Sequence, residues 1–306
     1  MSTLVVSTAR DPASLNLYNA LQRRCAFEPV LQGDGVSIHR CGDVWSYHAE
    51  EKHMHELDHV DQTFSDAATQ PLPRDVLFLS RHASKSGTPA LCCHAIGVPE
   101  GTEAKSGGES GKYPPPSPLL APTYRLLHKV VKASALSHFD ASLEASHHGP
   151  LLKTPCMFVE IGSTEAEWDL SEPADLWVDA LVELLGLSER GGKPGSPSEM
   201  CWASLSPDAR AAATVVFGAG GGHYQAKLSD ALRADESAFV GHMLAGYIFD
   251  FEKDDWQKTL EAARSSTALA YGREPLLRVD KKGFQADKRA RIVAFAEERG
   301  WKYLVK

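Results

Sequence analysis

Short, continuous apolar runs alternate along this chain with segments of helical periodicity, and that alternation is the feature that most constrains the fold. Runs such as 4–6, 75–80 and 156–162 are almost entirely apolar, as expected for strands buried on both faces of a sheet. Helices are expected between them, the first with Asp11 as its N-cap and Pro12 in its first turn. The pattern predicts a three-layer α/β/α domain with a mixed, mostly parallel sheet.

The other elements are expected from the same two periodicities. Further strands are expected at 35–48 (a pair turning at Gly42), 139–146, 211–218, 276–280 and 302–305. Further helices are expected at 124–135, 172–187, 227–233, 255–271 and 285–299. Thr164 and Glu167 have the spacing of a capping box, which predicts that a helix begins there.

A chain of 306 residues suits one large domain or two modest ones. Two stretches, at about 98–122 and 188–199, are rich in glycine, proline and serine. This composition is typical of surface insertions. We therefore expect residues 1–306 to form a single catalytic domain with two surface insertions.

The net charge of −8 argues against a protein held on nucleic acid by bulk electrostatics, although it leaves room for local basic patches. No apolar run approaches the roughly 18 residues that a membrane-spanning helix needs, and the N-terminus does not resemble a signal peptide. The six cysteines form no CxxC pair and mostly lie in apolar surroundings, as expected for reduced core thiols. These features predict a cytoplasmic protein with neither a membrane nor DNA as a partner.

Histidine is the unusual residue of this chain, with thirteen copies. Several lie in glycine- or serine-rich turns near predicted strand ends, namely His82, His94, His147, His148, His223 and His242. A histidine in this position can act as a general base, bind a metal ion or donate to a substrate. Any single one could equally be a buried histidine bonded to the backbone. Because ligands of α/β sheets bind where strands end, the recurrence predicts that two or more of these histidines share one cleft.

Glu160 interrupts the apolar run 156–162 and is therefore expected to be buried. A buried carboxylate needs a partner, because removing a lone charge from water is costly. A histidine, an arginine or a metal ion would serve. A structural ion pair without a catalytic role explains this residue equally well.

The glycines 220–222 follow the strand predicted at 211–218, so their amides could approach an anion. They match neither GxGxxG nor a P-loop, and a bare tight turn explains them equally well. The nucleophile motif GxSxG and the zinc motif HExxH are both absent. Cys92 and Cys93 directly precede His94, a poor arrangement for a Cys–His dyad because neighbours on a strand point to opposite faces.

The segments that carry these histidines look like the signature blocks of the D-aminoacyl-tRNA deacylases of archaea and plants, whose plant members are also known as GEKO-type proteins. The blocks are Ser80-Arg81-His82-x-Ser84, Glu144-Ala-Ser-His147-His148-Gly-Pro150, Phe158-Val-Glu160-Ile-Gly162, Gly220-Gly-Gly-His223-Tyr224 and Gly241-His242. They occur in the order of the family and extend over nearly the whole chain.

The resemblance implies a single α/β domain related to the phosphorylase and peptidyl-tRNA hydrolase architecture. It implies a hydrolase that cleaves the ester bond of D-aminoacyl-tRNA, including aldehyde-modified forms, to free D-amino acid and tRNA. Such an enzyme has a proofreading or detoxification role in translation, and the family is described as zinc-dependent. Two alternatives remain open. One is a nucleoside phosphorylase- or peptidyl-tRNA hydrolase-like enzyme of the same architecture, and the other is a non-enzymatic protein that binds tRNA or a metal.

Ester hydrolysis needs an activated water and a group that stabilises the developing oxyanion, and zinc could provide both. The residues expected to be catalytic are His82, His148, Glu160 and His223. Those expected to bind zinc are His94, His147, His148 and His223. Those expected to bind the charged tRNA are Arg81, Lys85, Gly220, Gly221, Gly222, Tyr224, Lys227 and His242. A metal-free arrangement would use one histidine as the base and the glycine-loop amides as the oxyanion site.

Overall fold

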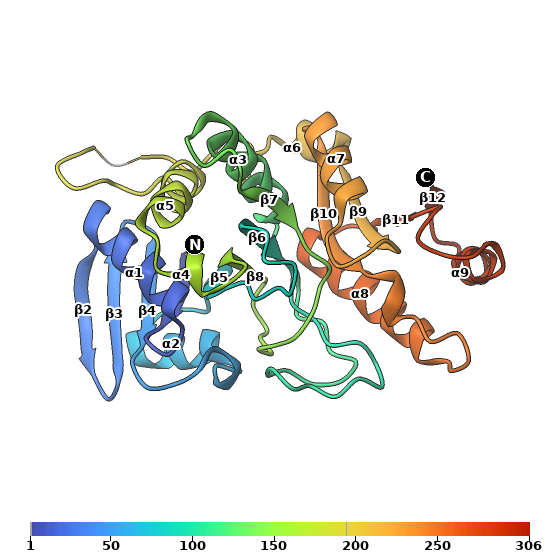
Figure 1. The fold of residues 1–306 in the computed structure, drawn as a ribbon, viewed down its shortest axis with the longest axis horizontal. Coiled ribbons are helices and arrows are strands. Elements are labelled where there is room, and N and C mark those ends of the chain that lie inside the picture. The colour runs from blue at the N-terminus through green and yellow to red at the C-terminus, as the bar shows by residue number, and fades with distance from the viewer. Residues whose placement is uncertain (1, 194) are drawn as a thin grey trace.

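The computed structural model describes residues 2–193 and 195–306, and within them two β-sheets lie side by side (Figure 1). The first sheet has the strand order β2-β3-β4-β1-β5-β8-β6-β7 and the second the order β10-β9-β11-β12. The strands of the first sheet are β1 (Thr3–Thr8), β2 (Glu28–Gly33), β3 (Val36–Cys41), β4 (Val44–Ala49), β5 (Asp75–Arg81), β6 (Ala90–His94), β7 (Asp140–Leu143) and β8 (Cys156–Gly162). Those of the second are β9 (Thr214–Ala219), β10 (Ala238–Leu244), β11 (Leu276–Val279) and β12 (Tyr303–Val305).

Most neighbouring strands run parallel. In the first sheet β4, β1, β5 and β8 run in one direction, and β6 and β7 run in the opposite one. The second sheet is parallel throughout. The predicted α/β class with a mixed, mostly parallel sheet is therefore confirmed, but the strands are divided between two sheets. Both sheets are made from the same kind of apolar run, so the sequence pattern carries no sign of this division.

Helices cover both faces of each sheet. They are α1 (Pro12–Arg24), α2 (Val60–Ala68), α3 (Leu120–Ala133), α4 (Glu165–Trp168), α5 (Ser171–Leu185), α6 (Pro207–Ala212), α7 (Ala226–Ala234), α8 (Asp255–Tyr271) and α9 (Ala286–Glu298), with short 3₁₀ turns at Met54–Glu56, Trp202–Ser204 and Gly246–Ile248. On one face of the first sheet α1, α3 and α5 share a core that contains Trp177, and on the other face α2 packs through Phe64. The helix α3 also packs against β10 and α7 of the second sheet, so it joins the two halves (Figure 1).

Local signals in the sequence account for many element boundaries. The side chain of Asp11 accepts a hydrogen bond from the Ser14 amide at 2.9 Å and caps α1, as predicted. The capping box at Thr164 is also formed. The strand expected at 139–146 is shorter, because β7 ends at Leu143 and the chain then turns toward the second sheet. The strands β2, β6 and β10 and the helix α6 are elements that the sequence did not predict.

The two proline- and glycine-rich stretches differ in their environment. Residues 99–112 are mostly exposed, but Tyr113 is buried with its ring 4.9 Å from that of His242. The hydroxyl of Ser117, which is also buried, donates to Asp75 at 2.7 Å. The segment predicted as a surface insertion at 98–122 is thus a surface segment only in its first half. The stretch 188–199 is mostly exposed as predicted, apart from residue 194, which lies outside the described residues.

All six cysteines are free thiols, and each of them is buried. This finding confirms the prediction of reduced core thiols. Among the described residues, no helix combines the length and the apolar character that crossing a membrane would require.

The exposed segment 99–112 is held against the loop that follows β7. The amide of Gly149 donates to the carbonyl of Ser106 at 3.2 Å, and the amide of Gly97 donates to the carbonyl of His148 at 3.0 Å. A Cβ atom on Gly149 would lie 2.2 Å from backbone atoms of the neighbouring residues 107 and 108. The close approach of these two segments therefore requires glycine at position 149.

We expect the Gly149→Ala substitution to lower the free energy of unfolding by about 1–3 kcal/mol, because the added methyl group forces two backbone segments apart. Urea denaturation followed by circular dichroism measures this change. Gly222→Ala is the matched control, because a Cβ atom there meets nothing within 4 Å, and we expect a change within about 0.5 kcal/mol. Equal midpoints for the two variants would contradict the tight packing described above.

Candidate active site

The alternation of side chains along neighbouring strands gathers polar groups on one face of the first sheet. Glu160 on β8 is paired in register with Cys92 on β6, and Phe158 is paired with His94. Because side chains two residues apart on a strand share a face, Glu160, Cys92 and His94 all point to the same side. The rings of His94 and Phe158 stack with their centroids 5.1 Å apart.

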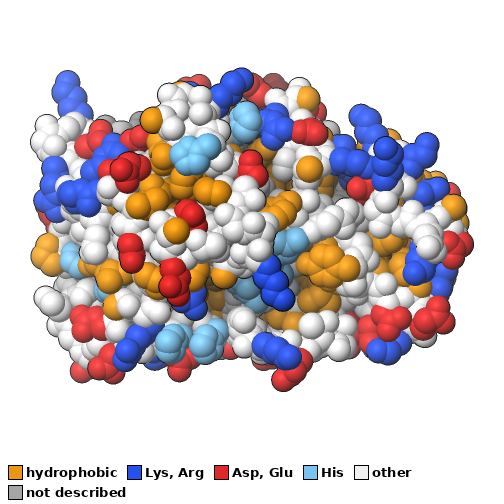
Figure 2. Space-filling model, viewed as in Figure 1, with side chains coloured by type: hydrophobic (Ala, Val, Ile, Leu, Met, Phe, Trp, Pro, Cys, Tyr) orange, Lys and Arg blue, Asp and Glu red, His pale blue; other side chains and the backbone are white. Residues whose placement is uncertain are grey.

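Loops at strand ends bring further residues to this place. His82 follows β5, the segment 144–148 follows β7, and His223 follows β9. The amide of Ala145 donates to the carbonyl of His223 at 2.8 Å, which ties the loop after β7 to the second sheet. The site therefore lies where the two sheets meet, and histidine side chains are visible near the middle of the face in Figure 2. We call the following residues the histidine cluster: His82, His94, Glu144, His147, His148, Glu160 and His223.

Two buried carboxylates, those of Glu144 and Glu160, lie within this cluster. His82 Nδ1 lies 3.1 Å from Glu144 Oε1 and 3.6 Å from Glu160 Oε2. His94 Nε2 lies 3.8 Å from Glu160 Oε1, and His223 Nε2 lies 3.3 Å from Glu144 Oε2. No lysine or arginine in the described part of the chain pairs with either carboxylate. Imidazole rings alone therefore offset the negative charge.

The charge balance of the cluster follows from these distances. Burial opposes the ionisation of Glu160, but the nearby imidazoles of His82 and His94 lower its pKa to about 2. Burial alone would lower the pKa of His82 and His94, yet the neighbouring Glu160 and Glu144 raise both above the ordinary histidine value. Glu160 is therefore ionised at neutral pH, and the imidazoles of His82 and His94 are the groups that stabilise its charge.

Three histidines have their ring nitrogens arranged alike. Nδ1 donates to a backbone carbonyl close in sequence at 3.0 Å in His94, 2.8 Å in His147 and 2.6 Å in His148. Because a carbonyl can only accept, Nδ1 carries a proton in each of the three rings, and Nε2 presents a lone pair whenever the ring is neutral. Burial lowers the pKa of His147 well below its usual value and that of His148 to about 4, so both rings are neutral at pH 7. One ligand atom from each of the three lies within 4.8 Å of the others.

The backbone of His148 has a φ of 40°, in the left-handed region that residues other than glycine seldom adopt. Such a conformation costs on the order of 1–3 kcal/mol and persists only where the surrounding structure enforces it. Here the amide of Gly97 holds the carbonyl of His148. The strain is located at a residue whose side chain belongs to the histidine cluster, which is typical of functional sites.

His223, like His147 and His148, is only partly buried. Its side chain is 32% exposed, whereas that of Glu144 is fully buried. With Glu144 next to Nε2, the other nitrogen, Nδ1, lies 3.3 Å from the hydroxyl of Tyr247. The hydroxyl of Tyr224 lies 2.9 Å from His82 Nε2. A histidine that is held on one side by a buried carboxylate and is exposed on the other is oriented to act as a general base.

His242 does not lie with the cluster. Its Nε2 donates to the carbonyl of Pro114 at 3.1 Å, and its Nδ1 accepts from the hydroxyl of Ser146 at 3.0 Å. The residue is fully buried, and burial lowers its pKa to about 3. Both nitrogens of a neutral ring are thus occupied, so the geometry gives His242 a structural position and leaves no ring nitrogen for a substrate.

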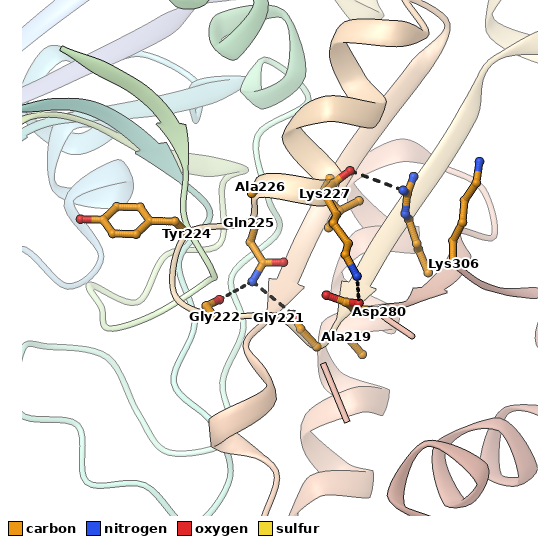
Figure 3. Close-up of a pocket in the computed structure, with 12 residues that line it drawn as sticks. Ala219, Gly221, Gly222, Tyr224, Gln225, Ala226, Lys227, Asp280 and Lys306 are labelled. Atoms are coloured by element: carbon orange, nitrogen blue, oxygen red, sulfur yellow. Dashed lines mark hydrogen bonds and ion pairs between the residues drawn. The ribbon is translucent and has the colours of Figure 1, made fainter. Parts of the chain in front are cut away.

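The glycines 220–222 and Lys227 line a separate cavity of about 190 Å³, and none of the histidines in the cluster lines it. Figure 3 shows Lys227 directed at Asp280, with which it forms an ion pair, and Tyr224 pointing out of this cavity. Arg81, the last residue of β5, and Lys85, on the segment that follows, were also expected to bind substrate, and both are exposed. The guanidinium of Arg81 lies over the ring of Trp168, 5.2 Å from its centroid.

Three residues near the site were not predicted from the sequence. Glu144 stands three residues before the pair His147-His148, and a carboxylate so close to two histidines was the available signal. Cys92 has its sulfur within 4.8 Å of ligand atoms of His82 and Glu144, and burial raises the pKa of its thiol well above the usual value. Tyr247, beside His223, carries no signal in the sequence, because it comes from the 3₁₀ turn after β10.

Comparisons with known proteins agree with this geometry. A family model described as D-aminoacyl-tRNA deacylase matches residues 69–304. A D-aminoacyl-tRNA deacylase of Arabidopsis thaliana is 33% identical over 97% of this chain and 96% of its own length. One of Pyrococcus horikoshii is 27% identical over 98% of each chain.

Among solved structures, a conserved protein of unknown function, AF0625, matches with a TM-score of 0.75 over 99% of this chain and 95% of its own, at 24% identity. This likeness concerns the fold alone. The match to the family model and the full-length match to the plant protein are sequence relationships, and they agree with each other. The chain therefore belongs to the D-aminoacyl-tRNA deacylase family.

Proposed function

We propose that this chain is a hydrolase that cleaves the ester bond of D-aminoacyl-tRNA and releases free D-amino acid and tRNA. The observation that carries the proposal is the pair formed by the buried Glu144 and the partly exposed His223 at the junction of the two sheets. Family membership disfavours the alternatives of a nucleoside phosphorylase-like enzyme, a peptidyl-tRNA hydrolase-like enzyme and a non-enzymatic binding protein. The proposal includes aldehyde-modified D-aminoacyl groups as substrates and a proofreading role in translation.

The described residues fit the zinc ion that the resemblance implies. His94 Nε2 and both carboxylate oxygens of Glu144 are buried without an aligned hydrogen bond from any residue that the structure describes. Unsatisfied buried polar atoms are costly, and a cation would satisfy the nitrogen lone pair of His94 and place a positive charge near the buried carboxylates. His94, His147 and His148 would hold the ion, with backbone carbonyls fixing the tautomer of each ring. When bound, zinc would polarise the ester carbonyl and stabilise negative charge on its oxygen.

The remaining residues of the cluster have roles in proton transfer. Glu144 keeps a proton on Nε2 of His223, so that Nδ1 can accept a proton from the attacking water. Burial would lower the pKa of His82, but the neighbouring Glu160 and Glu144 raise it above its ordinary value and so favour the protonated ring. The hydroxyl of Tyr224, 2.9 Å from His82 Nε2, can pass a proton to the ribose oxygen that leaves. His223 is thus the general base, and His82 with Tyr224 is the general acid.

The cavity beside the glycine loop is suited to a phosphate of the tRNA. Lys227, Arg278 and Lys306 line it, and Asp280, which pairs with Lys227, is the acidic side chain within it (Figure 3). Backbone amides of the glycine loop and positive side chains are the groups that bind phosphate. The same loop continues into His223. A phosphate bound in this cavity would therefore belong to a nucleotide near the 3′ end of the tRNA, close to the ester bond. Arg81 and Lys85 are proposed as further contacts to the terminal nucleotides.

We place the enzyme in the cytoplasm, where charged tRNA is used. The support is chemical: six thiols remain unpaired in the structure, as expected in a reducing compartment.

We expect His223→Ala to lower the turnover of D-tyrosyl-tRNA by about a hundredfold or more, because the general base is lost. Release of D-tyrosine under single-turnover conditions measures this effect, and circular dichroism checks folding. His138→Ala is the matched control, because His138 is exposed on the loop before β7 and far from the cluster. Turnover of His223→Ala close to that of the unmodified protein would refute the assignment of the base.

We expect the protein to retain zinc after incubation with the ion and dialysis, and His148→Ala to retain much less. The reason is that the substitution removes one of three converging lone pairs. Atomic emission spectrometry of the dialysed proteins measures the metal content without reference to activity, with His138→Ala again as the control. Identical zinc contents in all three proteins would argue against these ligands.

We expect Arg278→Ala to raise KM for D-tyrosyl-tRNA and to reduce the slope of log binding constant against log salt concentration by about one. Hydrolysis of D-tyrosyl-adenosine, which lacks phosphates, should remain unchanged. Lys193→Ala, at an exposed lysine of the 188–199 stretch, is the control with the same loss of charge. An unchanged salt slope for Arg278→Ala would contradict the proposal that this cavity binds a phosphate.

A further inference from the structure

A second cavity, of about 450 Å³, adjoins the histidine cluster. His147 and His148 form part of its wall, so it opens directly onto the place where the ester would react. Its other walls come from three segments that are distant in sequence: 98–106, 145–146 and 245–248. Its volume is in the range that binds small organic groups.

The lining of this cavity changes from apolar to polar between its inner and outer ends. Val98, Ala145 and Ala245 are buried, and Ile248 is half-buried. At the outer end Tyr247 is 68% exposed. Glu103 and Lys105, which also line the cavity, are both highly exposed and pair with each other at 3.5 Å. The inner end thus provides apolar contact and no unpaired charge, which disfavours a phosphate as its occupant.

We propose that this cavity, which we call the acyl pocket, receives the side chain of the D-aminoacyl group, and that residues of the 98–106 segment limit which side chains are accepted. The inference rests on the proposed ester hydrolysis and extends it to substrate selection. The β-carbon of an aminoacyl group is only two bonds from the ester carbonyl. A substrate whose carbonyl lies at the histidine cluster therefore places its side chain in a cavity that the same histidines line.

The arrangement of the two cavities supports this orientation of the substrate. The cavity with Lys227, Arg278 and Lys306 is basic and lies beside the glycine loop, whereas the acyl pocket is mostly apolar. Charged tRNA has the same asymmetry about its ester bond, with phosphates on one side and an amino-acid side chain on the other. The two cavities thus match the two ends of the substrate in chemical character.

The wall formed by the exposed segment is fixed in place. The amide of Gly149 donates to the carbonyl of Ser106, and the amide of Gly111 donates to the carbonyl of Val98 at 3.0 Å. The amide of Gly108 donates to a carboxylate oxygen of Asp58 at 3.2 Å. A fixed wall can discriminate between side chains by size, because accepting a larger group would require these bonds to break.

The size of the pocket can be changed in both directions. Ala104 is half-buried in the wall, so Ala104→Trp narrows the pocket, and Ile248→Ala widens it. Ala212→Trp, at an exposed alanine of α6 remote from the site, controls for the introduction of an indole ring. One tRNA should be charged chemically with either D-tyrosine or D-alanine, so that only the side chain differs between the substrates.

The quantity to measure is the ratio of kcat/KM for the D-tyrosyl form to that for the D-alanyl form. We expect Ala104→Trp to lower this ratio by about tenfold or more, Ile248→Ala to raise it, and Ala212→Trp to leave it unchanged. Equal losses on both substrates in Ala104→Trp would overturn the proposal and assign the pocket to the terminal adenosine instead. An unchanged ratio in both pocket variants would also overturn it. Failure of the unmodified protein to hydrolyse either substrate would instead refute the proposed function itself.

Discussion

Two carboxylates are buried in this protein with only imidazole rings as partners of opposite charge, and the rest of the structure depends on that constraint. Removing a carboxylate from water costs several kcal/mol even after relaxation, and no single segment of this chain could balance Glu144 and Glu160 alone. The partners come from the ends of β5, β6, β7 and β9, and the indole of Trp177 fixes the backbone carbonyl of Glu160 at 3.0 Å. Both sheets must therefore be assembled before the charges are balanced, which couples the site to the whole fold.

The fold was predictable where a segment has one strong local pattern. The helix at 255–271 has the limits expected from its periodicity, and Gly272 terminates it with a positive φ. The strand β2 was missed because all its residues are exposed, so it has no buried face to mark in the sequence. The strand β10 was missed because glycine and histidine interrupt its apolar run at 241–242. Whether strands join one sheet or two depends on contacts between distant segments, which no local pattern records.

The site was predictable in its residue types but not in its pairings. His82 follows the end of β5, and His94 ends the antiparallel strand β6, so the two rings approach Glu160 of β8 from opposite ends of that strand. His223 is added by the loop that follows β9 in the second sheet. His242 has the same surroundings in sequence, and it is removed from the cluster by hydrogen bonds to Ser146 and Pro114 that only the folded chain forms. Glu144 shows the opposite case, because it lies in the cluster although its position in the sequence did not predict burial. A glutamate at the end of a strand is normally solvated, and its burial results from the second sheet closing over it.

The buried thiols have a consequence for the chemical durability of the protein. Burial raises the pKa of Cys25 and of Cys201 to about 11, and that of Cys92 well above its usual value. Oxidants and carbon electrophiles react with the thiolate form of cysteine. Burial and the raised pKa values leave little accessible thiolate for them to attack. Chemical modification of these thiols would therefore require the surrounding core to open first, so the resistance of the protein to oxidants depends on the stability of its fold.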